Sequence, residues 1–175
     1  MQISNRHFIQ STLESLIEPG NLVLDGAAGI GINTRFFASR VGANGHVLSF
    51  NESKEDANKT ASSLFMAGLQ DRVDVINGAV TKDKLEAEIG RVTKVDVAIL
   101  DYGSDTGTSL PTRETLNEQI NLIWNQIKDD GLLIVNLTRN QQAANFDVSI
   151  TDDTNKASYQ TSSDLTYLLE RKSEN

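Results

Sequence analysis

The feature that most constrains the fold is a repeated change in the spacing of apolar residues. Short apolar runs, typical of buried strands, alternate with stretches in which apolar residues recur at helical spacing. The pattern predicts strands at 22–24, 46–50, 73–76, 95–100 and 132–137, and helices at 9–17, 34–41, 53–67, 81–89 and 112–127. Such alternation predicts βαβ units, and therefore an α/β fold with a mostly parallel central sheet flanked by helices.

The C-terminal part departs from this alternation. Two further strands are expected at 146–150 and 165–170, but only residues 138–145 separate the first of them from the strand at 132–137. A parallel connection needs about a dozen or more residues, usually including a helix. We therefore expect the last crossover helix to be missing. The final two strands then form an antiparallel pair, either as a meander or with the sixth strand reached by an extended return. The whole chain, 1–175, is expected to be a single domain.

The composition excludes several classes of protein. The chain has no cysteine, which excludes disulfides, thiolate metal sites and a cysteine nucleophile, and suits a reducing cytoplasm. His7 and His46 lack metal-ligand spacing, so we expect no metal. No apolar run approaches the ~20 residues of a membrane span, so no membrane partner is expected. The net charge is −8, and the basic residues are scattered, which argues against a nonspecific grip on nucleic acid.

A glycine-rich loop, Asp25-Gly-Ala-Ala-Gly-Ile-Gly-Ile-Asn-Thr34, follows the first strand. In open α/β sheets, ligands bind at the carboxyl ends of the strands, and a helix beginning near Asn33 would direct free N–H groups there. The loop loosely fits a dinucleotide pattern, but a carboxylate at Asp25 would repel a pyrophosphate. The same carboxylate suits the sulfonium and ammonium of S-adenosylmethionine, which we favour. A tight turn without a ligand remains the alternative.

Several short motifs together identify a resemblance that runs from about Ile9 to Leu137. They are Pro19-Gly20-Asn-Leu-Val-Leu-Asp25, Gly29-Ile-Gly31-x-Asn-Thr34, Gly42-x-x-Gly45-His46-Val47, Val95-Asp96-x-Ala98 and Gly131-Leu-Leu. The chain resembles the Rossmann-like class I methyltransferases that use S-adenosylmethionine. More narrowly, it resembles a small bacterial family of rRNA methylases, some of which methylate an aminomethyl group on the wobble uridine of tRNA. The resemblance implies an RNA acceptor, either tRNA or rRNA.

The resemblance and the strand ends together give a candidate site. The ribose is expected at Asn51 or, if the strand end rotates, at Glu52, and the adenine beside Asn77, Gly78 and Ala79. The full set of expected cofactor contacts is Asp25, Gly26, Ala27, Gly29, Gly31, Asn33, Thr34, Asn51, Glu52, Asn77, Gly78, Ala79 and Asp101. Asp101 is also the expected catalytic residue, as a base or an orienting group, with Tyr102 stacking on the acceptor. Acceptor contacts are expected from Ser104, Asp105 and Arg113.

The chain also departs from the family pattern at this site. Ala27, Ile30, Ile32 and Asn33 replace polar members of the family loop, Asn51 replaces an acid, and the loop after the fourth strand is shorter. Each loss removes a hydrogen bond or charge worth about 0.5–3 kcal/mol. Two alternatives to RNA methylation therefore stay open: methylation of a small molecule, and a noncatalytic binding or dimerisation protein. We also expect a homodimer through the sheet edge that the missing helix leaves uncovered.

Overall fold

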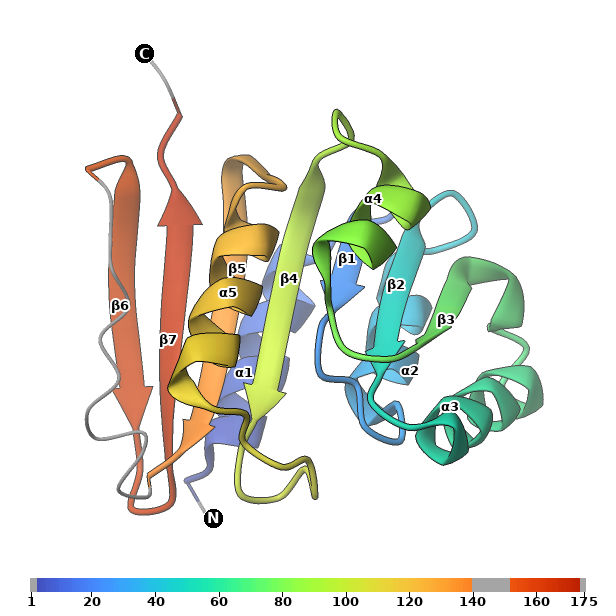
Figure 1. The fold of residues 1–175 in the computed structure, drawn as a ribbon, viewed down its shortest axis with the longest axis horizontal. Helices are drawn as coiled ribbons and strands as arrows, with labels where there is room; N and C mark the ends of the chain where they lie inside the picture. Colours follow the sequence, from blue (N-terminus) through green and yellow to red (C-terminus); the bar gives the residue numbers. More distant parts are fainter. Residues whose placement is uncertain (1–2, 140–151, 174–175) are drawn as a thin grey trace.

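A seven-stranded sheet lies between two layers of helices in the described part of the chain, residues 3–139 and 152–173 of the computed structural model (Figure 1). The strands are β1 (Leu22–Asp25), β2 (His46–Asn51), β3 (Val73–Asn77), β4 (Val95–Tyr102), β5 (Ile127–Thr138), β6 (Thr154–Gln160) and β7 (Asp164–Arg171). The helices are α1 (Asn5–Leu16), α2 (Ile32–Arg40), α3 (Lys54–Met66), α4 (Lys82–Ile89) and α5 (Arg113–Trp124), with a short 3₁₀ turn at Gln70–Arg72. The alternation predicted up to residue 137 is confirmed, although Ile127 begins β5 instead of ending α5.

Short polar side chains cap the three helices that follow β2, β3 and β4. Ser53, Thr81 and Thr112 each accept a hydrogen bond from the backbone N–H three residues ahead, at the starts of α3, α4 and α5. Such caps satisfy donors that have no partner inside the helix. They set the helix starts close to the carboxyl ends of the strands that precede them.

The strands follow the order β3-β2-β1-β4-β5-β7-β6. Strands β1 to β5 are parallel, while β7 runs antiparallel to both β5 and β6. Strand β6 is therefore parallel to β5 but separated from it by β7. The expected antiparallel pair is present, but the meander is wrong, because a meander would place β6 directly against β5.

One strand, β6, lies where the sequence analysis predicts none. It is formed by Thr154–Gln160, most of whose side chains are exposed, so it carries no apolar alternation that could reveal it. The strand expected at 146–150 and most of the connection expected to lack a helix lie outside the described residues.

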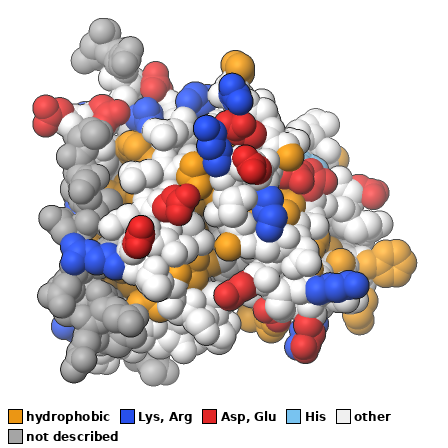
Figure 2. All heavy atoms as spheres, in the orientation of Figure 1, with side chains coloured by type: hydrophobic (Ala, Val, Ile, Leu, Met, Phe, Trp, Pro, Cys, Tyr) orange, Lys and Arg blue, Asp and Glu red, His pale blue; other side chains and the backbone are white. Residues whose placement is uncertain are grey.

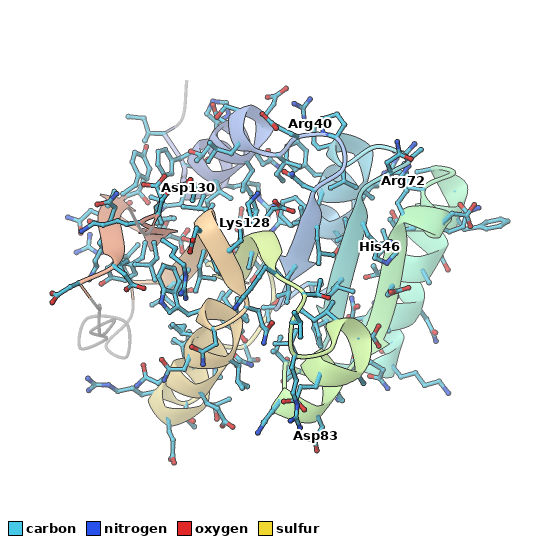
Figure 3. All side chains as sticks on the ribbon, turned by 90° about the horizontal axis from the view of Figure 1, so that it is seen from above. Arg40, His46, Arg72, Asp83, Lys128 and Asp130 are labelled. Atoms are coloured by element: carbon cyan, nitrogen blue, oxygen red, sulfur yellow. The ribbon has the colours of Figure 1, made fainter. Side chains whose placement is uncertain are left out.

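Two apolar cores cover the two faces of the sheet. On one face α1, α2 and α3 pack through residues such as Leu13, Phe37 and Leu64. On the other face α4 and α5 pack through residues such as Leu85 and Ile120. Figure 3, which looks along the sheet from above, shows these layers on opposite sides of the strands. Phe65, at the end of α3, lies outside both cores and is 72% exposed.

No helix within residues 3–139 and 152–173 is long and apolar enough to cross a membrane. The parallel strands all end at the lower edge of the sheet in Figure 1, and α1 begins at that edge too. The loops that follow β1, β2, β3 and β4 therefore meet there with the first turn of α1.

Candidate functional site

A cavity of about 150 Å³ lies at the carboxyl ends of the strands. Its walls come from loops after four different strands and from one helix. The lining residues are Gly26, Ala27, Gly29, Phe50, Glu52, Ala79, Tyr102, Thr108, Ser109, Leu110, Pro111, Thr115 and Gln119. Open parallel α/β sheets bind ligands at this edge. The cavity brings together residues that are far apart in the sequence.

The glycine-rich loop is held against the sheet by its own backbone. The N–H of Gly26 donates to the Ile99 carbonyl at 2.8 Å, and the N–H of Ala28 donates to the Phe50 carbonyl at 3.0 Å. A Cβ at Gly31, whose φ is +85°, would lie 2.6 Å from the Thr60 side chain. This glycine therefore makes room for the protein's own packing, while Gly26 and Gly29 line the cavity.

Asp25 lies beneath this loop and is fully buried. Its Oδ2 accepts a hydrogen bond from the Thr34 hydroxyl at 2.8 Å, and the Thr34 hydroxyl lies 2.9 Å from that of Ser49. Among the described residues, Oδ1 makes no hydrogen bond of good geometry, although the backbone N–H groups of Ala27 and Thr34 lie near the carboxylate and lower its pKa. Burial raises the pKa of Asp25 to about 7, an increase that the Thr34 hydrogen bond offsets only in part. Neither Asp25 nor Thr34 lines the cavity.

Asn51 and Glu52, the two residues predicted to bind the ribose, lie at the end of β2 in different surroundings. The Asn51 side-chain amide donates to the Gly29 carbonyl and to the Thr60 hydroxyl, both at 2.8 Å, and its Oδ1 accepts from Ser49 at 3.1 Å. These bonds occupy Asn51 in holding the glycine loop. Glu52 is exposed and lines the cavity. Of the two, Glu52 is the residue in position to meet a ligand.

The segment after β3 contributes one of its three predicted residues to the cavity, Ala79. The Gly78 N–H donates to the Asn51 carbonyl at 2.6 Å. The Asn77 carbonyl accepts from Lys84 Nζ at 3.1 Å, which ties the end of β3 to α4. Asn77 and Gly78 therefore shape the turn that presents Ala79.

Asp101 is buried at the end of β4 and is surrounded by donors. Its Oδ2 accepts from the Asn33 amide at 2.8 Å, and its Oδ1 accepts from the Asn136 amide at 2.9 Å and from the Gly103 N–H at 3.1 Å. Asn136 in turn accepts from Thr166, which accepts from Asn5 of α1. Asp101 thus anchors a buried polar network that links the glycine loop to β5, β7 and α1. Its role as a base stays a prediction.

The loop after β4 is fastened at two points. The backbone N–H and hydroxyl of Ser104 donate to the two carboxylate oxygens of Asp164 in β7, at 2.8 and 2.9 Å. Asp105 pairs with Arg6 of α1, with 2.5 Å between Oδ2 and Nε. Ser104 and Asp105 therefore hold the loop over the site. Arg113 is exposed at the start of α5 and does not line the cavity.

Tyr102 forms part of the cavity wall and is nearly buried. Its hydroxyl donates to Gln119 Oε1 at 2.7 Å. Burial raises the pKa of Tyr102 to about 12, so the hydroxyl keeps its proton at neutral pH. The stacking role expected for Tyr102 stays a prediction.

Gln119, Asn136 and Asp164 were missed by sequence reasoning. One signal for Gln119 was present: it interrupts the apolar face of α5 between Leu116 and Ile123, and polar residues on buried faces need partners. Asn136 and Asp164 carry no such local signal, because their partners lie 35 and 60 residues away in the sequence.

A second, much smaller opening lies on the other side of the glycine loop. It is lined by Arg6, Ala27, Ala28, Ile30, Ile32, Asn33 and Thr106. Ala27 lies between the two openings and lines both. The loop is therefore flanked by the cavity of about 150 Å³ and by this second, smaller opening.

No protein-family model matches this chain, and no curated protein matches it. Similar solved structures exist. The provisionally named rRNA methylase of Clostridium thermocellum is 18% identical, with a TM-score of 0.82 over 98% of this chain and 100% of that one. An rRNA methylase of Streptococcus thermophilus is 17% identical, with a TM-score of 0.76 over 99% of each chain. An O-methyltransferase of Bacillus cereus, solved in complex with SAH, is 16% identical, with a TM-score of 0.71 over 98% of this chain and 83% of that one.

These neighbours have little sequence in common with this chain but share its architecture over nearly its whole length. The protein has the Rossmann-like fold of class I methyltransferases.

Proposed function

We propose that this protein binds S-adenosylmethionine in the cavity and transfers the methyl group to an acceptor that reaches the glycine loop through the second opening. The observation that carries the proposal is the combined lining of the cavity. Glycines from the loop after β1, an acid after β2 and apolar residues after β3 and β4 meet in one space. These are the residue types that a nucleoside requires.

The residues present fit the nucleoside part of this cofactor. Glu52 offers a carboxylate that can accept charge-assisted hydrogen bonds from ribose hydroxyls. Phe50, Ala79 and Leu110 provide apolar surface for a flat ring. Beneath the loop, the buried Asp25 carboxyl gives a nearby negative charge for the cationic end of the ligand when it is ionised, without lining the cavity itself.

The cavity is smaller than the whole cofactor requires. Ligand sites of this kind enclose ~300–1,000 Å³, against about 150 Å³ here. The additional space must come from movement of the loop at 103–112 or from the second opening. The Ser104–Asp164 and Arg6–Asp105 contacts fasten that loop, so binding has to accommodate or break them.

Chemistry at the site is largely a matter of orientation. The sulfonium supplies an already activated methyl group. The protein must align acceptor, methyl carbon and sulfur, which is worth several kcal/mol of the barrier. Asn33 lines the second opening, and its side-chain amide donates a hydrogen bond to the buried Asp101 carboxylate at 2.8 Å. Their fixed geometry can orient a polar group of the acceptor.

The charge around the second opening favours a small acceptor over RNA. Arg6, the basic residue in its lining, is paired with Asp105. Ile30 and Ile32 at the same opening are 46% and 50% exposed. Binding to a phosphate backbone depends on accessible cations. RNA, the acceptor that the sequence resemblance implies, remains the alternative.

Three other cations lie away from the second opening. Arg40, Arg72 and Lys128 lie at the opposite edge of the sheet, where β3 and β5 start and α2 ends (Figure 3). On the face shown in Figure 2, lysine and arginine side chains are scattered among acidic ones and form no continuous basic surface.

Isothermal titration of the purified protein with S-adenosylmethionine and S-adenosylhomocysteine tests cofactor binding. We expect micromolar affinity for the wild type and at least a tenfold loss in Glu52→Gln, which removes the charge near the ribose. Glu55→Gln, at an exposed site in the first turn of α3, is the matched control and keeps the wild-type affinity. Absence of binding at millimolar ligand would refute the proposal and favour the noncatalytic alternative.

Transfer of labelled methyl groups separates the acceptor classes. Total RNA and the small-molecule fraction of a cell extract are offered in parallel reactions. We expect label in the small-molecule fraction. Label in RNA alone would overturn the small-acceptor preference while leaving methyl transfer intact.

A further inference from the structure

One polar side chain reaches the cavity from a helix instead of a loop. Gln119, in the second half of α5, lines the cavity and is only 3% exposed. Its neighbours along the same face, Leu116, Ile120 and Ile123, belong to the apolar core. An amide in such surroundings is costly unless its donors and acceptor find partners.

Only half of this amide is satisfied by the protein. The Tyr102 hydroxyl donates to Oε1 at 2.7 Å, which fixes the orientation of the amide group. The Nε2 group carries two hydrogens, and no acceptor among residues 3–139 and 152–173 is found for it. Four buried side-chain atoms have neither solvent contact nor a hydrogen-bond partner among the described residues, and Nε2 is not one of them. Because Nε2 has no partner among these residues, it must therefore face open space. The open space beside Gln119 is the cavity.

The position of Gln119 in the fold determines which part of a ligand it can meet. Glu52 and the glycine loop belong to the ends of β2 and β1, whereas α5 packs over β4 and β5 (Figure 1). In the sheet order, β2 and β4 lie on opposite sides of β1. A nucleoside whose sugar lies against Glu52 and the glycine loop can place the far edge of its base beside Gln119, which lines the same cavity.

We propose that Gln119 Nε2 donates a hydrogen bond to N1 of the adenine base and that Tyr102 acts as the positioning residue that orients the amide. The inference rests on the proposed function, and it adds the feature that selects the base. In adenine, N1 is an acceptor and matches an amide donor. In hypoxanthine, N1 carries a hydrogen, so an N–H would face an N–H.

Flat apolar surface around this donor supports a ring as its partner. Phe50, Ala79, Leu110 and Pro111 line the same cavity. Among the lining residues from the loops and α5, Gln119 is the one that combines near-complete burial with an unpaired donor. A single fixed donor within an apolar cavity discriminates between bases, because a base that cannot accept its hydrogen bond leaves buried polar groups unpaired.

Adenosine and inosine are suitable probes because they differ at N1 and C6 of the base and share the same sugar. Titration of the wild type with each, and with S-adenosylhomocysteine, gives the base preference independently of methyl transfer. We expect adenosine to bind at least tenfold more tightly than inosine. Equal affinities would overturn the inference.

Variants of Gln119 test whether this side chain causes the preference for adenosine over inosine. Gln119→Glu replaces the donor with an acceptor and is expected to abolish or reverse the preference. Gln119→Leu removes the donor with an apolar side chain that suits this face of α5, and is expected to abolish the preference even if the glutamate variant does not fold. Retention of a tenfold preference in a folded Gln119 variant would refute the assignment.

Tyr102→Phe tests the positioning role. It keeps the ring in the wall but releases the amide, so the adenosine-to-inosine ratio is expected to fall several-fold. A merely structural role would change stability without changing that ratio. Glu118→Gln, at the exposed neighbouring position on α5, is the matched control and keeps the wild-type ratio.

The three ligands distinguish failure of this inference from failure of the proposed function. If S-adenosylhomocysteine binds but the base preference is absent, base selection by Gln119 is wrong and cofactor binding stands. If adenosine is preferred but S-adenosylhomocysteine does not bind, the cavity is an adenine site and the proposed function is wrong. If none of the three binds, both are wrong.

Discussion

The substitution Asp25→Asn tests the electrostatics of the glycine loop most directly. Asp25 is fully buried beneath the loop. Burial raises its pKa from 3.8 to about 7, with the nearby Asp101 carboxylate adding to the rise and the Thr34 hydroxyl opposing it. Because the folded state holds this proton more tightly than the unfolded state, it is stabilised at low pH. That stability is lost as the pH rises toward the folded pKa.

The size of the effect follows from the shift. Between the two pKa values the folded protein binds one proton that the unfolded chain has released, so the free energy of unfolding falls by about 1.4 kcal/mol per pH unit. From pH 5 to pH 8 the loss amounts to about 3 kcal/mol and levels off above pH 7. Asparagine has the same shape and does not titrate. The variant therefore gains about 3 kcal/mol relative to the wild type over this range.

Urea unfolding and thermal unfolding at pH 5, 6, 7 and 8 measure this difference as a free energy and as a Tm. Each kcal/mol corresponds to ~2–4 °C in Tm for a protein of this size, so the Tm difference between variant and wild type grows by about 6–12 °C. Asp129→Asn, at an exposed position, is the control and leaves the pH profile unchanged. A difference between wild type and Asp25→Asn that stays constant from pH 5 to pH 8 would show that this carboxyl titrates as in the unfolded chain and would refute the reasoning.

Two further predictions concern stability. Gly31→Ala places a Cβ 2.6 Å from Thr60 at a φ of +85° and is expected to cost about 2–4 kcal/mol of the free energy of unfolding in chemical denaturation. Gly68→Ala, with a φ of +71° and open space around it, is expected to cost about 1 kcal/mol, and equal costs would exclude packing at Gly31. Asp164→Ala leaves the two Ser104 donors without their acceptor and is expected to cost about 1–3 kcal/mol in thermal unfolding; an unchanged Tm would mean that water replaces the carboxylate fully.

Much of the fold was predictable because its determinants are local. The strands at the centre of the sheet are continuous apolar runs, as expected for strands buried on both faces. Ser53 marked the start of α3 because a hydroxyl at a helix start is a short-range device whose partner lies three residues ahead. The glycine loop was recognised from its spacing, and it lies where strand and helix order placed it.

The parts that were not predictable depend on contacts distant in the sequence. Strand β6 pairs on one side with β7 and leaves most side chains exposed, so its sequence resembles that of a loop. Its position beyond β7 cannot be derived from spacing, because both alternatives satisfy the same connection length. The Asn5–Thr166 hydrogen bond joins residues 161 positions apart, and no short-range pattern announces it.

The polar residues of the site divide into two groups that sequence alone could not separate. Asn51, Asp101 and Ser104 have their hydrogen-bonding atoms taken up by protein partners that hold the loops in place. Glu52 and the Nε2 group of Gln119 face the cavity with no such partner among the described residues. Removing a polar side chain of the first group is costly because its buried partners are then left without hydrogen bonds. Substitutions in the first group should therefore lower stability first and affinity as a consequence. Substitutions in the second group should change affinity while the fold remains intact.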